Sequence, residues 1–304
     1  DPREIERMCF EVYRDIYWKG GPVLMSAISG IEMAMWDITG KFFNAPVYAL
    51  MGGKLRDSVR MYANAWFVGA KTPEEFAKAA RKAVNLGVTA LKWDPFGKAH
   101  MTLENRELNQ ASAIVGAVRE AVGPEIDLLI ECHGRFNAFT ALRIAQELRQ
   151  YEIMLMEEPC PPDNLSVLAE IRSKSPVPIS AGERVYTKFG FDDLFARNAV
   201  DIVQPDIFHA GGMFESKKIA AMAEARHIPV SFHNPSGPVS NAAILQLAAC
   251  TPNFLIHEIM LTDGTFRKHI SNECVEFEKG FIRIPDSPGL GIEVNESVLS
   301  EYPY

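Results

Sequence analysis

Residues 126–131 have the sequence IDLLIE, a short apolar run that ends in a carboxylate and is followed by a helix-forming segment rich in Ala, Glu and Arg. The same alternation of apolar or β-branched runs with helix-forming segments recurs along most of this chain. Eight such runs occur, at residues 59–63, 88–91, 126–130, 153–156, 177–180, 202–203, 228–232 and 254–257. Strands that alternate with helices are typical of βα units, so the sequence predicts a parallel sheet.

The spacing of the runs favours a closed barrel. From the third run onward, the first ionisable groups at the carboxyl ends are separated by 26, 26, 23, 27 and 25 residues, which suits one strand plus one helix. Eight units within about 200 residues are at the lower end for a (β/α)8 barrel. The rival fold, an open doubly wound sheet, normally carries a glycine-rich phosphate turn such as G-x-G-x-x-G, and the sequence has none.

Both flanks of the predicted barrel, which we place at residues 54–262, differ from it. Residues 1–53 show apolar positions at helical spacing, so we expect the helical part of a smaller α+β capping domain. Residues 263–304 show a hairpin or extended strands over 275–285 and 289–294, and we expect them to pack on the N-terminal block. The last barrel strand then lacks an ordinary closing helix, which makes the predicted fold an α/β protein of the (β/α)7β barrel type.

Composition limits the class of partner. The chain has 31 Lys and Arg against 39 Asp and Glu, a formal charge of -8, and no basic cluster, which argues against a nucleic-acid partner. We expect no membrane partner, because no apolar run is as long as a bilayer span. Five scattered cysteines fit a reducing, cytoplasmic compartment: Cys9, Cys132, Cys160, Cys250 and Cys274. We also expect a homo-oligomer.

Three carboxylates are expected at the barrel mouth. Glu131, Glu157 and Glu183 end successive strands, and side chains at the carboxyl ends of barrel strands converge. Like charges that meet in one space are unfavourable unless a cation neutralises them. Oxygen ligands without Cys or His suit Mg²⁺ or Mn²⁺ rather than Zn²⁺. The alternative is that these are ordinary surface glutamates at the starts of loops.

The neighbouring strand ends carry a candidate acid–base set. Asp206 and His233 end successive strands, where a carboxylate can fix the tautomer of an imidazole and raise its basicity. The alternative for His233 is a core histidine with satisfied hydrogen bonds. His133 is a candidate general acid, or a residue that only orients Glu131 two positions before it. Glu258 is a candidate hydrogen-bonding partner of a substrate carboxylate, or a buried salt-bridge partner.

Several motifs resemble the enolase superfamily, specifically its mandelate racemase subgroup and the acid-sugar dehydratases within it. The resemblance covers nearly the whole chain, and its motifs are AISGIEMAMWD (27–37), LMGG (50–53), ECHGR (131–135), EEP (157–159), GER (182–184) and HNPSGP (233–238). It implies Mg²⁺ bound by Glu131, Glu157 and Glu183. It also implies a catalytic base on the seventh strand, and this superfamily is a known example of a Lys or His base that works with Mg²⁺.

Two positions depart from the family pattern. The third-strand ligand is usually Asp and here is Glu131, whose extra methylene the backbone can absorb. Racemases of the subgroup carry Lys-x-Lys on the second strand, with the second lysine as a base, and here the sequence is Lys92-Trp93-Asp94. Without that base, racemisation through both faces of the substrate is disfavoured, whereas loss of a β-hydroxyl needs only one base and one acid.

The resemblance therefore implies a carbon–oxygen lyase, which dehydrates an aldonate-type acid sugar to a 2-keto-3-deoxy acid through an enediolate. His233, oriented by Asp206, takes the C2 proton, and His133 protonates the leaving hydroxyl. Lys92 and Arg135 are expected to bind the substrate. The alternatives are an epimerase, racemase or cycloisomerase of another carboxylate and, from a different class, a catalytically silent barrel. We expect this chain to lack the β-rich piece that precedes this segment in the family, so the sugar acid and its hydroxyl configuration are not predicted.

Overall fold

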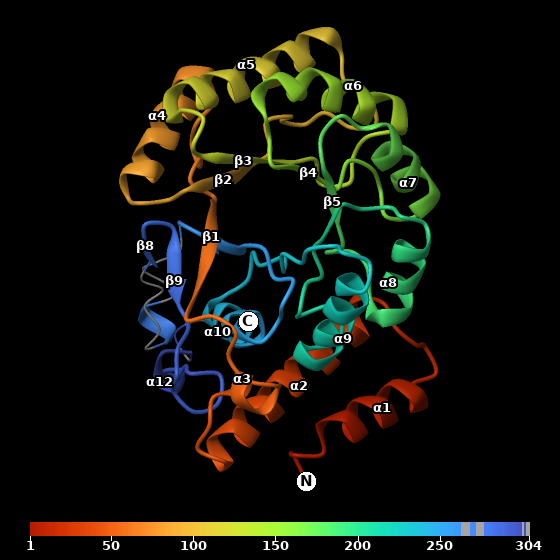
Figure 1. Ribbon diagram of the computed structural model, residues 1–304, viewed down its shortest axis with the longest axis vertical. Helices are drawn as coiled ribbons and strands as arrows, with labels where there is room; N and C mark the ends of the chain where they lie inside the picture. Colours follow the sequence, from red (N-terminus) through yellow and green to blue (C-terminus); the bar gives the residue numbers. More distant parts are fainter. Residues whose placement is uncertain (263–267, 272–276, 300, 302–304) are drawn as a thin grey trace.

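The computed structural model describes residues 1–262, 268–271, 277–299 and 301, and a ring of parallel strands lies at its centre (Figure 1). Strands β1 to β6 pair in chain order, and β7 returns to pair with β1. Their bounds are β1 (Ser58–Asn64), β2 (Ala90–Trp93), β3 (Asp127–Glu131), β4 (Leu155–Glu157), β5 (Ile179–Ala181), β6 (Ile202–Val203) and β7 (His257–Met260). The side chains of these strands are mostly buried, as in a barrel whose interior is filled.

The ring closes through the segment 228–232, which the sequence predicts as a strand. In the structure, isolated bridges pair this segment with its neighbours. Val230 bridges in parallel to Val203 on one side and to Phe254 on the other. Pro229 has no N–H to donate to a ladder, which helps to explain why the pairing stays short. The predicted parallel barrel is confirmed, with its seventh strand reduced to these bridges.

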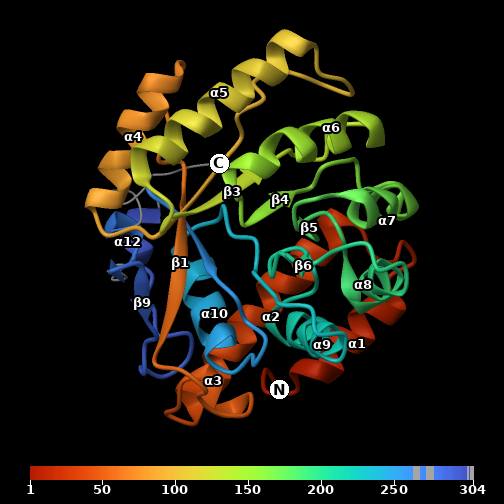
Figure 2. The same ribbon diagram turned by 45° about the horizontal axis from the view of Figure 1, so that its top comes forward.

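Helices connect successive strands and cover the outside of the ring (Figures 1 and 2). They are α4 (Pro73–Asn85), α5 (Asn105–Val122), α6 (Ala138–Leu148) with the 3-10 turn η1 (Arg149–Tyr151), α7 (Leu165–Lys174), α8 (Thr187–Ala196), α9 (Met213–Glu224) and α10 (Pro238–Ala249). Capping residues mark where some of these helices begin. Thr72 and Glu75 form a capping box at the start of α4, and Asn137 caps α6. Because the helices run back along the ring, the carboxyl ends of all the strands meet at one mouth.

The described parts of the two flanking segments contact each other. The N-terminal block consists of α1 (Ile5–Asp15), α2 (Pro22–Phe42) and α3 (Val47–Leu50), and the tail adds β8 (Phe277–Glu278), β9 (Phe281–Arg283) and α12 (Glu296–Leu299). Val47 N–H donates to Gly289 O (3.0 Å), and Leu290 N–H donates to Asp37 Oδ1 (2.9 Å). The tail strands form an antiparallel hairpin whose second strand, β9, pairs with β1. The domain limits at residues 53 and 262 stay predictions.

Some expectations lie outside the described residues, namely the one for Cys274 and the first two residues of the hairpin predicted over 275–285. Cys9, Cys132, Cys160 and Cys250 are free thiols. In the part of the chain that the structure describes, none of the helices combines the length and the apolar character needed to cross a bilayer.

A buried carboxylate joins the N-terminal block to the barrel. Glu32, in α2, accepts hydrogen bonds from the first two backbone N–H groups of α9, those of Met213 and Phe214 (both 2.8 Å), and from Trp36 Nε1 (2.8 Å). The first N–H groups of a helix have no partner within it, and the helix dipole favours an anion there. Gly212, at φ +94°, permits this approach, because a side chain there would overlap the carboxylate. Glu32 thus caps α9 from another helix.

Replacing Glu32 by alanine should lower the free energy of unfolding at pH 5 by about 2 to 4 kcal/mol, because buried N–H groups lose their acceptor. Urea unfolding followed by circular dichroism measures this. Glu120→Ala, which removes an exposed glutamate from α5, is the control and should cost less than about 0.5 kcal/mol. Equal losses in the two variants would contradict the capping role.

The same residue predicts a pH dependence of stability. Burial raises the pKa of Glu32 from 4.5 to about 7, although the bonds from Phe214 and Met213 act in the opposite direction. Between these two values the folded chain holds a proton that the unfolded chain has released, so the contribution of Glu32 to stability falls as the pH rises. The difference in unfolding free energy between wild type and Glu32→Ala should shrink across this window and level off above it. A difference that grows with pH would be inconsistent with this assignment.

Candidate active site

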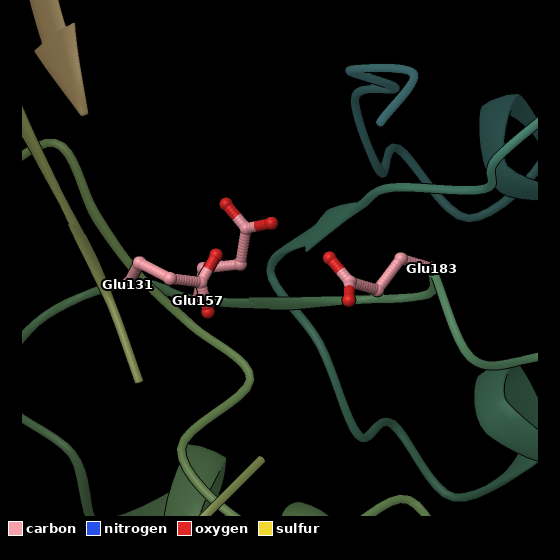
Figure 3. A group of neighbouring side chains, drawn as sticks. All are labelled: Glu131, Glu157 and Glu183. Carbon is pink, nitrogen blue, oxygen red and sulfur yellow. The ribbon is translucent and has the colours of Figure 1, made fainter. Parts of the chain in front are cut away.

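Three glutamates meet at the carboxyl ends of neighbouring strands. Glu131 ends β3, Glu157 ends β4, and Glu183 follows β5 (Figure 3). Glu131 and Glu157 are direct partners in the parallel register, which accounts for their proximity. One oxygen from each of the three carboxylates lies within 4.8 Å of the other two. The structure therefore brings together the three residues that the sequence suggests as metal ligands.

One buried lysine lies among these carboxylates. Lys92 Nζ, from β2, donates to both oxygens of Glu157 (3.0 and 2.9 Å), and it lies 3.0 Å from Glu258 Oε1 and 3.5 Å from Glu131 Oε2. Burial, followed by the charge of Glu131, raises the pKa of Glu157 to about 8, and the charge of Lys92 opposes this rise. A single ammonium thus faces three carboxylates, which leaves the cluster rich in negative charge.

The chemistry of this donor set fits a hard divalent cation. Glu131, Glu157 and Glu183 offer only carboxylate oxygens, which are the ligands that such cations prefer. Oxygens within 4.8 Å of one another can share a cation whose metal–oxygen bonds are about 2.0 to 2.6 Å long. A cation would also relieve the repulsion that contributes to the raised pKa of Glu157. These residues could therefore hold a divalent metal.

His233 is held between two carboxylates. Its Nδ1 lies 2.8 Å from Oδ2 of the buried Asp206, and its Nε2 lies 2.9 Å from Glu183 Oε2. Phe208 N–H donates to the other oxygen of Asp206 (2.7 Å) and so orients that carboxylate. Burial lowers the pKa of His233, but the bonds to Asp206 and Glu183 outweigh it and raise the pKa well above 6.5. The two carboxylates fix the orientation of the ring, and its role as a general base stays a prediction.

His133 presents its ring to a different aspartate. Its backbone N–H donates to Glu131 Oε1 (2.6 Å), whereas its Nδ1 lies 2.6 Å from Asp94 Oδ2. The residue has a positive φ of 52°, and its side chain is 50% exposed. The backbone, and not the imidazole, therefore orients Glu131. His133 therefore orients Glu131 through its main chain, as the alternative role expects, and a general-acid role for its ring stays a prediction.

Glu258 is bound on both sides by the protein. Its Oε1 accepts a bond from Asn64 Nδ2 (2.8 Å) besides the contact with Lys92, and its Oε2 accepts one from Asn234 N–H (2.8 Å). Burial raises the pKa of Glu258, but the charges of Lys92 and His233 outweigh burial and hold the pKa at about 2. This geometry favours the alternative of a buried salt-bridge partner, while a contact with substrate stays a prediction.

Arg135, predicted to bind substrate, instead joins two loops at the mouth. It donates to Cys132 O (3.0 Å) in its own loop, and to Gly97 O (2.8 Å) and Asp94 Oδ2 (2.6 Å) in the loop that follows β2. Lys92 is likewise occupied by carboxylates. Roles for Arg135 and Lys92 toward a substrate therefore stay predictions.

Sequence reasoning missed Asn64 and Gln204 as polar partners of the site, and it noted Asp94 only as a departure from the racemase pattern. Asn64 bonds Glu258, Asp94 bonds His133, and Gln204 Nε2 donates to Glu157 Oε2 (2.9 Å). Asn64 ends β1, Asp94 directly follows β2, and Gln204 directly follows β6. A polar amide or carboxylate at the end of a buried apolar run is the signal that could have found all three.

Comparisons with known proteins agree over nearly the whole chain. Residues 75–298 match the family model described as enolase C-terminal domain-like. Residues 1–52 match the N-terminal domain of the mandelate racemase / muconate lactonizing enzyme family. Among solved structures, a member of the enolase superfamily from Salmonella Typhimurium has a TM-score of 0.95 at 30% identity, and the match covers 100% of this chain and 83% of that one.

Curated relatives are about a third identical to the chain over the aligned residues. D-gluconate dehydratase of Thermoproteus tenax is 38% identical over 99% of this chain, and D-xylonate dehydratase of Haloferax volcanii is 37% identical over 97% of it. The chain spans 61% of the length of the first relative and 74% of the second. D-galactonate dehydratase of Pectobacterium atrosepticum is 33% identical over 99% of this chain, which spans 80% of that relative.

Titration calorimetry should show saturable binding of a divalent cation to the wild-type chain. Binding to Glu183→Gln should be weaker by at least about 10²-fold, because loss of a ligand costs more than the 10- to 100-fold loss typical of its outer partners. Glu158→Gln is the matched control, since Glu158 is the neighbouring carboxylate but forms an ion pair with Arg184. Unchanged affinity in Glu183→Gln, or equal loss in both variants, would argue against the metal site.

Proposed function

Because the chain belongs to the mandelate racemase / muconate lactonizing enzyme family of the enolase superfamily, we propose that it dehydrates acid sugars. Its relatives include D-gluconate, D-xylonate and D-galactonate dehydratases. We propose that the substrate is an aldonate-type sugar acid and the product a 2-keto-3-deoxy acid. The observation that carries the proposal is a carboxylate triad accompanied by two histidines, each hydrogen-bonded through Nδ1 to its own aspartate.

We propose Mg²⁺ as the resident metal, with Mn²⁺ as a possible substitute, held by Glu131, Glu157 and Glu183. An oxygen-only donor set supports this choice over zinc. When bound, the cation would act as a Lewis acid that stabilises negative charge developing on the substrate carboxylate. Lys92, among the same carboxylates, would add a fixed positive charge near that carboxylate.

His233 is the proposed general base. Asp206 accepts its Nδ1–H, so Nε2 is the nitrogen that would take the proton from C2. This requires that Glu183, which lies 2.9 Å from Nε2, be engaged as a metal ligand and no longer as the partner of Nε2. The electrons of the broken C2–H bond move toward the carboxylate. Once Nε2 carries the proton, Asp206 stabilises the imidazolium at a distance of 2.8 Å.

His133 is the proposed general acid. It follows the third strand of the ring, whereas His233 follows the seventh segment of eight, so the two histidines approach from opposite sides of the mouth. As the C3–O bond breaks, the electrons held in the enediolate form the C2–C3 double bond of the enol. His133 gives its proton to the departing hydroxyl, which leaves as water. The enol then becomes the keto acid by protonation at C3. Substrate and product therefore differ by one water molecule.

Asp94 supports dehydration over racemisation. A racemase of this family needs a second base opposite His233, and the second strand supplies a lysine for it. Here that position is an aspartate whose carboxylate bonds His133 and Arg135, so it does not serve as that base. A homo-oligomeric assembly and a cytoplasmic location stay predictions from the sequence.

Replacing His233 by asparagine should lower the rate of keto-acid formation by roughly 10² to 10⁴, the range expected when a general base is lost. The assay follows 2-keto-3-deoxy product from D-gluconate, D-galactonate and D-xylonate with added Mg²⁺. Near wild-type turnover in the variant would refute the assignment.

His227→Asn is the matched control, because it makes the same replacement at an exposed histidine after α9 and should leave turnover unchanged. Running the wild-type reaction in deuterated water distinguishes dehydration from epimerisation, the main alternative. Deuterium in recovered substrate without any keto product would favour an epimerase over a dehydratase.

A further inference from the structure

We propose that Asp94 is a positioning residue that holds His133 in the orientation required of the general acid. This inference rests on the proposed dehydration and adds a second aspartate–histidine pair to the one formed by Asp206 and His233. Asp94 would then orient a histidine at the sequence position where racemases of the family carry a lysine base.

Asp94 is fixed in place by several bonds. It directly follows β2, which pairs with β3, so it lies beside the strand end that carries Glu131. Its Oδ1 accepts the N–H of Phe96 (2.9 Å), and its Oδ2 lies 2.6 Å from both His133 Nδ1 and Arg135 Nη2. Burial raises the pKa of Asp94, but the bonds from His133 and Phe96 outweigh it and lower the pKa below 3.8, so the group is a carboxylate near neutral pH.

The contact between Asp94 and His133 is not needed to shape the metal ligands. Glu131 receives its bond from the backbone N–H of His133, which any residue but proline would supply. The loop is also tied down by Gly134 N–H, which donates to Glu158 O (2.7 Å), and by Arg135. The imidazole is therefore a separate element, and Asp94 is the carboxylate that sets its direction.

The direction has a chemical consequence. A carboxylate that accepts Nδ1–H leaves Nε2 as the nitrogen able to exchange a proton with a substrate. No hydrogen bond from the described residues engages this Nε2, and the ring is 50% exposed. In contrast, Nε2 of His233 lies 2.9 Å from Glu183, and that side chain is 15% exposed. The pair formed by Asp94 and His133 thus directs Nε2, the nitrogen that would carry the proton for the leaving hydroxyl, to the open side of the site.

A double-mutant cycle tests whether Asp94 acts through His133. Asp94→Asn should slow keto-acid formation from D-gluconate by about 10²-fold, and His133→Asn by at least as much. The double variant should be no slower than His133→Asn alone, because residues that act as a unit lose their effect together. Losses that multiply in the double variant would overturn the proposal.

The ratio of C2 hydrogen exchange to keto-acid formation distinguishes a loss of His133 positioning from a loss of folded structure. In deuterated water, Asp94→Asn should still exchange the C2 hydrogen through His233 while making less keto acid. Equal loss of exchange and of dehydration would also overturn the proposal. Asp201→Asn is the matched control, because Asp201 accepts bonds from Arg172 (2.9 Å) and Ile179 N–H (2.9 Å) at the opposite end of the barrel and should leave this ratio unchanged.

A readout independent of activity keeps the two proposals distinguishable. Nitrogen-15 NMR of the wild-type chain, at a pH where the His133 ring is neutral, should show a protonated Nδ1, and Asp94→Asn should move the proton toward Nε2. A protonated Nε2 in the wild-type chain would overturn the role of Asp94 even if dehydration is found. A wild-type chain without keto product from any sugar acid tested would instead refute the proposed function, while the NMR result still decides the pairing.

Discussion

The concentration of carboxylates at one end of the barrel is the constraint on which the rest of the site depends. Parallel strands in register place Glu131 beside Glu157, and the next two strand ends add Glu183 and Asp206. Burial denies these groups the solvation that normally keeps them charged, so each needs a cation or a donor nearby. Lys92 and His233 neutralise part of the negative charge, and a divalent metal would neutralise the rest.

The same constraint explains why charged side chains at the mouth are held by several protein groups. Glu258 is bonded by Lys92, Asn64 and Asn234, and Arg135 links the loops that carry Asp94 and Cys132. A site whose charges are each fixed by protein groups is preorganised, because little has to move when charge develops on a substrate. His133 differs from these residues, since its ring is held at one nitrogen and open at the other.

Much of this arrangement could be predicted from sequence because it follows from strand periodicity. A carboxylate at the end of an apolar run lies at the mouth of a barrel wherever that run is a parallel strand, so Glu131, Glu157 and Asp206 could be placed without coordinates. The partners of Lys92 and Arg135 could not, because long side chains reach across strands to atoms that no local pattern specifies. The sequence predicts a full strand at 228–232 because the apolar character of this segment is clear, whereas its reduced pairing depends on its neighbours in the ring.

The hydrogen bonds that Glu32 accepts from α9 determine whether the N-terminal block and the barrel could be separated into two proteins. Ser29 Oγ also accepts a bond from Gly211 N–H (3.1 Å), and Ser26 Oγ contacts His209 Nδ1 (2.7 Å), so α2 holds the whole loop that leads from Asp206 to α9. Removal of residues 1–53 would expose this loop to solvent and leave the first backbone N–H groups of α9 without their acceptor, Glu32. The barrel therefore cannot be transferred to another protein without its N-terminal block. A replacement block would have to supply a carboxylate and hydroxyl groups that bond the same backbone and side-chain atoms of this loop and of α9.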